Sequence, residues 1–359
     1  VRDQRMPAQG HKGRGAISSP DNRFTTRPVD VDDDVAHERA QKAPETVIRA
    51  MPAGRIISSN NSPDVPFDRS INPYLGCEHG CIYCYARPSH SYLDLSPGLD
   101  FETQIFYKPN AAARLLEAWE KPGYACQPIT IGANTDPYQP AEKSLQLTRD
   151  LLALFLKHRH PVNIITKGNL VCRDIDLLAE LASTRLCSVA ISLPTMNADL
   201  KRIMEPRVPS AAARLNAMER LTQAGVPTSV LVAPIIPAIN DNEIEHILKS
   251  AAAAGACQAH YIFLRLPHEL KGLFAEWLQT HFPDRAERVS SLIRQSSGGS
   301  DYDPRFGLRQ TGRGPYAEML AMRFKTASRK HGIDADSYQH TLDCNQFFRP
   351  GQQQLGLDI

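Results

Sequence analysis

The chain has 359 residues, a formal net charge of +2 and eight cysteines. This length can bury a large core in one large or two ordinary domains, and the near-neutral charge demands neither a nucleic-acid nor a membrane partner. The beginning of the chain has no apolar signal segment and the apolar runs are too short to span a bilayer, so we expect a cytoplasmic protein with reduced thiols.

Residues 1–66 show almost no periodic apolar pattern and are rich in glycine, proline and serine. Basic residues dominate the first part, and an acidic run, Asp30 to Asp34, follows. This composition favours a flexible arm that cannot bury enough surface to fold alone. The alternative is a basic arm that is ordered by phosphates or by docking against the rest of the chain. Its basic residues are Arg2, Arg5, Lys12, Arg14, Arg23 and Arg27.

Three cysteines follow one another closely at Cys77, Cys81 and Cys84. Gly80 lets so short a loop turn tightly. Three thiolates cannot complete the four-ligand shell of structural zinc or of a closed iron–sulfur site, so one metal position would stay open for a small molecule. The alternatives are a zinc knuckle that takes His79 as its fourth ligand, or three unrelated thiols.

From Ile71 onward, short apolar runs alternate with amphipathic helical patterns, as in parallel strands buried on both faces. Counting a first strand that leads into Cys77, there are six βα units, which predicts a partial (βα)6 TIM-like barrel with an open lateral mouth. The other predicted strands are 128–132, 162–166, 188–192, 228–232 and 260–264, and the predicted helices cover 112–119, 151–158, 174–182 and 242–253.

After Leu266 the pattern is helical and more polar. Leu273, Trp277, Leu278 and Phe282 predict one helix, a loop follows over 296–313, and 316–330 predicts a last helix. The expected domains are therefore an arm over 1–66, a core over 67–267 and a helical extension over 268–359.

Polar residues follow the predicted strands at the points where each strand ends. In βα barrels, functional groups gather at these carboxyl ends. Each residue alone is a weak signal, but their joint occurrence after successive strands favours a binding site. The residues are Asn134, Thr135 and Asp136 after the second strand, Lys167 after the third, Ser192 after the fourth and Pro234 after the fifth.

With these features the chain resembles the radical S-adenosylmethionine (SAM) superfamily, and within it the spore photoproduct lyase-like branch. The resemblance covers roughly Asn72 to Pro267 and rests on the cysteine motif, the Thr-Asp-Pro turn, Thr-Lys at 166–167, Ser192 and Val-Ala-Pro-Ile at 232–235. The Lys-Gly-Arg-Gly segment of the arm and Asp343-Cys-Asn-Gln-Phe-Phe lie outside it. They look more like an uncharacterised bacterial group related to the lyase.

The resemblance implies a [4Fe-4S] cluster held by Cys77, Cys81 and Cys84, with SAM bound at the unique iron. It also implies a reductant such as flavodoxin or ferredoxin, and reductive cleavage of SAM to a 5′-deoxyadenosyl radical that takes a hydrogen atom from substrate. By the same resemblance, Tyr83 packs near adenine, Thr135 and Asp136 contact the methionyl end, and Lys167 and Ser192 hold the carboxylate or ribose. Asn134 and Pro234 complete the expected cofactor site.

One position departs from the lyase pattern, in which a hydrogen-donating cysteine lies three residues before the aspartate of the Thr-Asp-Pro turn. Ala133 stands there in this chain, which argues against the lyase's own route of thymine-dimer repair. Cys344 is the alternative candidate for a catalytic donor, although a lone cysteine is more often a small buried hydrophobe.

The leading interpretation is a radical SAM enzyme with an unknown substrate, nucleic acid ahead of protein. Phosphate contacts by the basic arm would make such binding salt-dependent. A different class is a nucleic-acid-binding protein with a structural cluster, and a zinc-binding scaffold is the third reading. In the second class, stacking and phosphate contacts would come from Tyr85, Arg87, His90, Tyr92 and Arg265.

Overall fold

The computed structural model describes residues 11–25, 45–334 and 341–351. Arg2, Arg5, Arg27 and the acidic run at 30–34 lie outside the described residues. Among the described residues, no helix is long and apolar enough to cross a membrane.

A seven-stranded sheet forms the centre of the molecule, in the order β10-β9-β8-β7-β6-β3-β2. The neighbours from β3 to β10 are all parallel, and β2 pairs antiparallel with β3 at one edge. The predicted six parallel strands of an α/β fold are thereby confirmed. Their bounds are β2 Ile57–Ser59, β3 Arg69–Ile71, β6 Ile129–Ile131, β7 Val162–Thr166, β8 Cys187–Ser192, β9 Thr228–Ile235 and β10 Gln258–Phe263.

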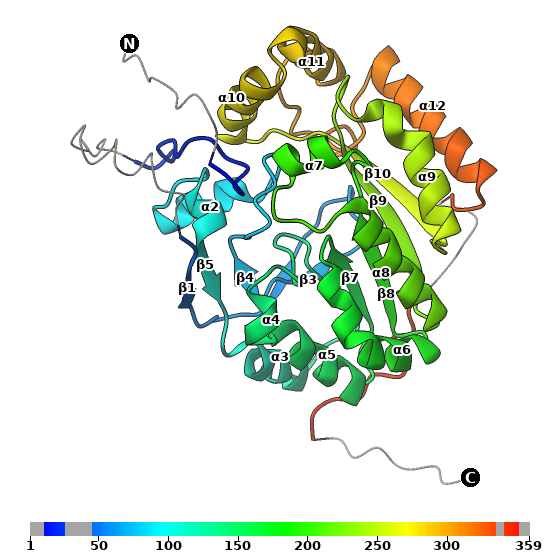
Figure 1. Ribbon diagram of the computed structural model, residues 1–359. Coiled ribbons are helices and arrows are strands. Elements are labelled where there is room, and N and C mark those ends of the chain that lie inside the picture. The colour runs from blue at the N-terminus through cyan, green and yellow to red at the C-terminus, as the bar shows by residue number, and fades with distance from the viewer. Residues whose placement is uncertain (1–10, 26–44, 335–340, 352–359) are drawn as a thin grey trace.

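Helices cover the outer face of this sheet (Figure 1). Their apolar stripes and the strands share one core, which is why the strands carry continuous apolar runs. The outer helices are α5 Leu147–Lys157, α6 Ile175–Ser183, α8 Ala211–Gln223 and α9 Ile244–Ala253. Three of them are preceded by a short helix: α4 Glu142–Leu145 before α5, η2 Asn169–Asp174 before α6 and η3 Asp241–Glu243 before α9. Helix α7, Ala198–Met204, follows β8 at the carboxyl end of the sheet.

Two strands inserted between β3 and β6 form, with the earlier strand β1, a second, three-stranded sheet in the order β1-β5-β4. It brings part of the predicted arm into the fold, because β1 pairs parallel with β5. Of the elements in this region, only helix α3 was predicted, from the apolar stripe over 112–119. The elements are β1 Val47–Ala50, β4 Tyr74–Leu75, η1 Arg87–Leu93, α2 Asp100–Thr103, β5 Gln104–Tyr107 and α3 Ala111–Glu120.

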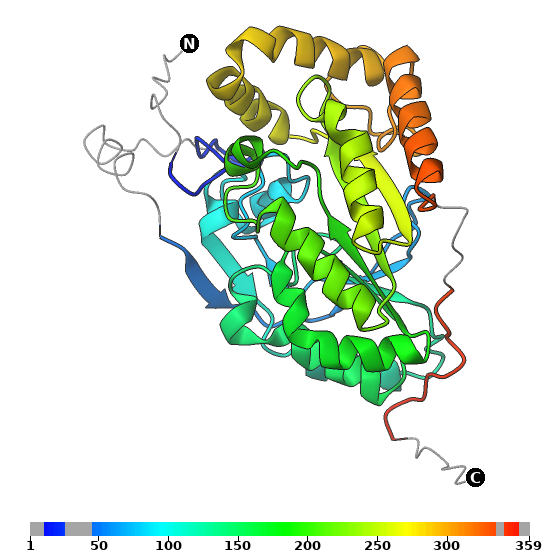
Figure 2. The same cartoon turned by 45° about the vertical axis from the view of Figure 1, so that its right-hand side comes forward.

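The C-terminal part contains α10 Leu270–His281, α11 Pro283–Ser296 and α12 Pro315–Lys330. In Figure 2, α10 and α11 lie at one end of the sheet and α12 runs beside α9. The loop before α12 bridges the two edges of the sheet. The amide of Phe263 in β10 donates to the Gln310 carbonyl (2.7 Å), and the Gly307 amide donates to Asp64 in the β2–β3 connection (2.5 Å). The expected lateral mouth is thus crossed by this loop.

Candidate functional site

The three-cysteine loop runs from the end of β4 to η1. Backbone hydrogen bonds fix both halves of it, from the Cys77 amide to the Phe101 carbonyl (2.9 Å) and from the Ile82 amide to the Met204 carbonyl (3.1 Å). Cys77 and Cys81 are each 7% exposed, and Cys84 is half-buried. Gly80 has a left-handed φ of 66°, and a side chain there would meet the Glu102 carboxylate. The loop is therefore held tightly by contacts with distant parts of the chain, and its glycine permits the close approach of Glu102.

Burial raises the pKa of all three thiols. Asp136 raises the pKa of Cys77 further, whereas Arg87 and Lys167 lower that of Cys84. A buried thiolate needs a compensating cation, and bound iron supplies that positive charge. None of the described cysteines forms a disulfide. The donor chemistry of the loop therefore fits a thiolate-ligated metal centre.

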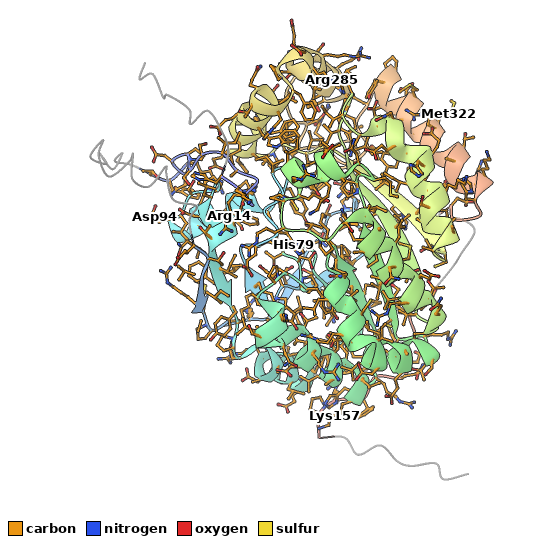
Figure 3. All side chains as sticks on the ribbon, in the orientation of Figure 1. Arg14, His79, Asp94, Lys157, Arg285 and Met322 are labelled. Carbon is orange, nitrogen blue, oxygen red and sulfur yellow. The ribbon has the colours of Figure 1, made fainter. Side chains whose placement is uncertain are left out.

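His79, the proposed fourth ligand of a zinc knuckle, points to a carboxylate. Its Nδ1 lies 3.3 Å from the Asp136 Oδ2, and its side chain is buried near the middle of the molecule (Figure 3). Within the described part of the chain, no three His, Cys, Asp or Glu side chains form a group that could hold a metal ion. The contact with Asp136 argues against His79 as a fourth ligand beside the three cysteines.

A buried ion pair between Arg87 and Glu102 (2.5 Å) supports the three-cysteine loop. The Arg87 guanidinium also donates to the carbonyls of Cys81 (2.9 Å) and Gly98 (2.8 Å), so the arginine is fully occupied inside the protein. His90 is likewise buried, with its Nε2 3.0 Å from the Gln104 carbonyl. The expectation that Arg87 and His90 contact nucleic acid is wrong, because neither side chain reaches solvent.

The segment 11–25 docks onto the same loop. The amides of Gly15 (3.0 Å) and Ala16 (2.8 Å) donate to the two oxygens of the Glu102 carboxylate. A side chain at Gly15 would lie 1.8 Å from the Gly80 carbonyl, so only glycine allows this approach. Arg14 donates to the Glu102 carbonyl (3.1 Å), and Arg23 pairs with Glu269 (3.0 Å). These two arginines of the predicted basic arm therefore hold it against the protein.

Asp136 is the centre of a second network. Its Oδ1 accepts hydrogen bonds from the Thr166 hydroxyl (2.6 Å) and the Tyr138 amide (2.9 Å), and its Oδ2 accepts one from the Lys167 amide (2.7 Å). Burial by itself would raise the pKa of Asp136, but His79 and these donors lower it to about 2. Every side of the carboxylate is engaged, so Asp136 positions the loops after β6 and β7.

We expect Asp136→Asn to destabilise the protein by about 2 kcal/mol at pH 7, since the carboxyl's pKa falls from an ordinary 3.8 to about 2 on folding. The lowered pKa stabilises the fold fully above pH 3.8, and this stabilisation is lost as the pH falls through 2. Urea denaturation should therefore show a gap between variant and wild type that narrows from pH 7 to pH 3. An equal gap at both pH values would contradict the assignment.

The predicted site residues Thr135 and Asn134, next to Asp136, differ in whether their side chains already have hydrogen-bond partners. The Thr135 hydroxyl is buried and donates to the Tyr74 carbonyl (2.8 Å). The amide of Asn134 donates to Asn72 (2.8 Å), and among the described residues its carboxamide has no hydrogen-bond partner. Asn134 therefore keeps free polar atoms, whereas Thr135 is used within the fold.

Lys167, Ser192 and Tyr83 come together at the carboxyl ends of β7 and β8. The Lys167 ammonium donates to the Ser192 hydroxyl (2.9 Å) and lies 5.7 Å from the centre of the Tyr83 ring. The Ser192 hydroxyl in turn donates to the Ala233 carbonyl (3.3 Å), next to the buried Pro234. The structure thus brings Tyr83 of the cysteine loop together with three predicted cofactor residues from the carboxyl ends of β7, β8 and β9.

Two residues that the sequence did not point to hold this group in place. Glu205 accepts a hydrogen bond from the Tyr83 hydroxyl and forms a buried ion pair with Arg214 (2.9 Å). Arg214 also donates to the Ser192 carbonyl (2.9 Å). No local pattern marks this pair, because its partners lie in distant segments and an isolated arginine in a helix is ordinary.

Tyr85 and Arg265 lie on the other side of Cys84. The Tyr85 hydroxyl donates to the Ala133 carbonyl, and the Arg265 guanidinium lies 5.2 Å from the Tyr85 ring centre. Tyr85 is 42% exposed, yet burial raises its pKa to about 12. Tyr85, next to Cys84 in the chain, therefore has part of its side chain at the surface and is held by its contacts with Ala133 and Arg265.

Cys344 lies at the opposite end of the strands. Its neighbour Asp343 donates its amide to the Arg185 carbonyl (3.0 Å), just before β8 begins, and Gln346 bonds the Thr184 carbonyl (2.8 Å). Burial and the nearby Cys344 raise the pKa of Cys126, which precedes β6. The structure therefore does not bring Cys344, the candidate hydrogen donor, to the three-cysteine loop.

Comparisons with known proteins agree with this arrangement. The radical SAM superfamily model matches residues 71–251. An uncharacterised protein of Mycobacterium tuberculosis is 37% identical over 237 residues, which cover 66% of this chain and 70% of the relative. One from Methanocaldococcus jannaschii is 28% identical over 221 residues, or 62% of this chain and 79% of the relative.

Solved structures of spore photoproduct lyase share the fold. A complex with dinucleoside spore photoproduct has a TM-score of 0.58 at 14% identity, over 87% of each chain. A variant with bound AdoMet and dinucleoside spore photoproduct has a TM-score of 0.57 at 15% identity, also over 87% of each chain.

Proposed function

The chain belongs to the radical SAM superfamily and is a radical SAM enzyme, and on that premise we propose that Cys77, Cys81 and Cys84 hold a [4Fe-4S] cluster that binds SAM at its open iron position. The observation that carries the proposal is a buried loop of three thiols, with His79 turned to Asp136. When bound, the cluster supplies the electron that cleaves SAM to a 5′-deoxyadenosyl radical.

The protein's own residues orient the cofactor and exclude water. Lys167 offers a cation and Ser192 a hydroxyl, which suits the SAM carboxylate or ribose. The free carboxamide of Asn134 suits the methionyl amino group. Tyr83 and Pro234 contribute apolar surface, while Glu205 and Arg214 fix the orientation of Tyr83 and Ser192. A flavodoxin or ferredoxin is the proposed reductant.

Nucleic acid is the substrate class that we propose. The support is the fold shared with spore photoproduct lyase, which binds a dinucleoside photoproduct, and the partly exposed aromatic ring of Tyr85 next to Cys84, a surface on which a base can stack. Ala133 supplies no thiol, so the proposal does not include a cysteine hydrogen donor at this position. The reaction carried out on the nucleic acid is left open.

We expect Lys167→Ala to weaken SAM binding by about ten-fold or more, since it removes a charge-assisted contact worth about 1.5–3 kcal/mol. Binding is measured by calorimetry on the anaerobically reconstituted protein. The control is Lys157→Ala at the far end of the molecule from the site (Figure 3), which should leave the affinity unchanged. Equal affinities for both variants and wild type would contradict the assignment, provided that the thermal stability of Lys167→Ala stays near that of wild type.

A further inference from the structure

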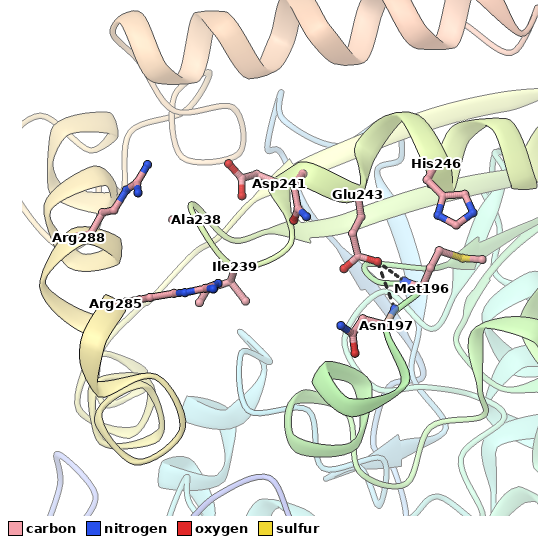
Figure 4. A pocket seen from close by; sticks show the side chains of 10 residues that line it. Met196, Asn197, Ala238, Ile239, Asp241, Glu243, His246, Arg285 and Arg288 are labelled. Carbon is pink, nitrogen blue, oxygen red and sulfur yellow. Dashed lines mark hydrogen bonds between the residues drawn. The ribbon is translucent and has the colours of Figure 1, made fainter.

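A pocket of about 740 Å³ lies at the carboxyl ends of β8 and β9, outside the residues assigned to the cofactor (Figure 4). Helix α11 forms one wall. The opposite wall comes from the segment before α7 and from η3 and α9, and Ala238 and Ile239 lie between the two walls. The volume falls in the range of small-molecule sites, roughly 300–1,000 Å³, and leaves room for a nucleotide-sized group.

The acidic groups of this pocket are already engaged. Glu243 accepts hydrogen bonds from the Thr195 hydroxyl (2.6 Å) and the Met196 amide (2.7 Å). Asp241 accepts one from the Tyr316 hydroxyl (2.6 Å). Both carboxylates therefore tie the connections after β8 and β9 to their neighbours, and their capacity to bind a cationic ligand is largely used.

The basic groups are not engaged in this way. Arg285 and Arg288 are exposed on α11, and Arg285 extends toward the loop that carries Ala238 and Ile239 (Figure 4). Among the described residues, neither arginine has an ion pair or a side-chain hydrogen bond, although Arg294 on the same helix pairs with Asp301 (3.7 Å). His246 lines the other wall. The unused cationic donors are thus two arginines one helical turn apart, and guanidinium groups match the oxygens of a phosphate.

The position of the pocket connects it to the proposed site. Met196 and Asn197 follow β8, whose last residue is Ser192, and Ala238 and Ile239 follow β9 and Pro234. A ligand in the pocket would therefore contact the two connections that directly follow Ser192 and Pro234, the residues proposed to hold SAM. Ala238 has a left-handed φ of 56°, a strained conformation that is common at ligand sites.

We propose that this pocket binds a phosphate group of the substrate, with Arg285 and Arg288 as its ligands. The inference rests on the proposed function, because it makes the pocket an anchoring site for the molecule on which the radical acts. The phosphate belongs either to a polynucleotide backbone or to a small phosphorylated molecule, and the two sources can be told apart with two probes.

The experiment measures binding of a single-stranded ten-nucleotide oligonucleotide and of inorganic pyrophosphate to the anaerobically reconstituted full chain. The test variant is the double substitution Arg285→Gln, Arg288→Gln. The matched control is Arg294→Gln on the same helix, outside the pocket.

We expect the test variant to bind about ten-fold more weakly than wild type or the control. For the oligonucleotide, the slope of log affinity against log salt should fall by about 1.4, the value for two lost phosphate contacts on a single strand.

Loss of oligonucleotide binding in the test variant supports a polynucleotide ligand, and loss of pyrophosphate binding alone supports a small phosphorylated one. The inference is overturned if neither probe binds wild type, or if the test variant and the control bind both probes equally. The same preparations are assayed for 5′-deoxyadenosine. Failed phosphate binding with intact SAM cleavage by wild type would overturn this inference alone, whereas absent SAM cleavage would overturn the proposed function.

Discussion

Replacing any one of Cys77, Cys81 and Cys84 by alanine should remove most of the iron from the anaerobically purified or reconstituted protein. In the proposed assignment each thiolate is one of three protein ligands, and His79 on the same loop is turned to Asp136 and offers no replacement. Iron and acid-labile sulfide are measured per chain, together with the visible absorption of the cluster. The wild type should hold about four irons per chain, the content of one [4Fe-4S] cluster.

Alanine at Cys126, Cys172, Cys187 or Cys257 is the control and should leave the iron content unchanged. Cys172 and Cys257 are half-buried like Cys84 but lie away from the loop, with their thiols directed at the carbonyls of Ala217 and Thr228. Full iron content in a variant of the loop would contradict the ligand assignment. Stoichiometric zinc in place of iron would support the zinc scaffold instead.

Replacing Arg87 by methionine should lower the free energy of unfolding by about 3–5 kcal/mol, the cost of leaving a buried carboxylate without its cationic partner. Both side chains of the Arg87–Glu102 pair are completely buried, and the arginine also holds the carbonyls of Cys81 and Gly98. The stability of the metal-free protein is measured by urea denaturation, so that loss of metal does not enter the result.

The control for this substitution is Arg202→Met, which breaks the exposed pair with Asp199. That pair is solvated and one helical turn apart, so its loss should change stability little. If Arg87→Met cost no more than this control, the buried pair would not be what supports the cysteine loop.

The central fold could be predicted from the sequence because its strands are largely apolar, with one face fully buried and the other partly buried. Runs such as 162–166 and 228–232 are largely apolar for that reason, and they form the parallel strands β7 and β9 on either side of β8. The spacing of the three cysteines and the positions of Lys167 and Ser192 after β7 and β8 were visible in the same way. These features depend on local sequence and on the strand order alone.

The supports of the site could not be predicted, because they depend on contacts between distant segments. Nothing in the sequence around Glu102 marks it, yet its carboxylate accepts hydrogen bonds from the amides of Gly15 and Ala16 in the predicted arm. Glu205 reaches Tyr83 across 122 residues. The strands β1, β4 and β5 are too short, at four, two and four residues, to show a period.

The loop before α12 was predicted over 296–313, but its bridging role could not be predicted for a similar reason. Its sequence is rich in serine, glycine and aspartate and predicts only a connection. Its place in the fold comes from Arg309, which pairs with Asp64 and donates to the Ser62 hydroxyl (2.5 Å). Only the folded chain brings these residues together.

The most direct measurement is the formation of 5′-deoxyadenosine. The full chain is reconstituted anaerobically with iron and sulfide, mixed with SAM and a strong reductant, and the products are separated by liquid chromatography. We predict that wild type forms 5′-deoxyadenosine and that Cys81→Ala forms none. A wild-type protein that holds its cluster and binds SAM, yet forms no 5′-deoxyadenosine with any reductant or nucleic acid supplied, would contradict the radical mechanism and favour a structural cluster.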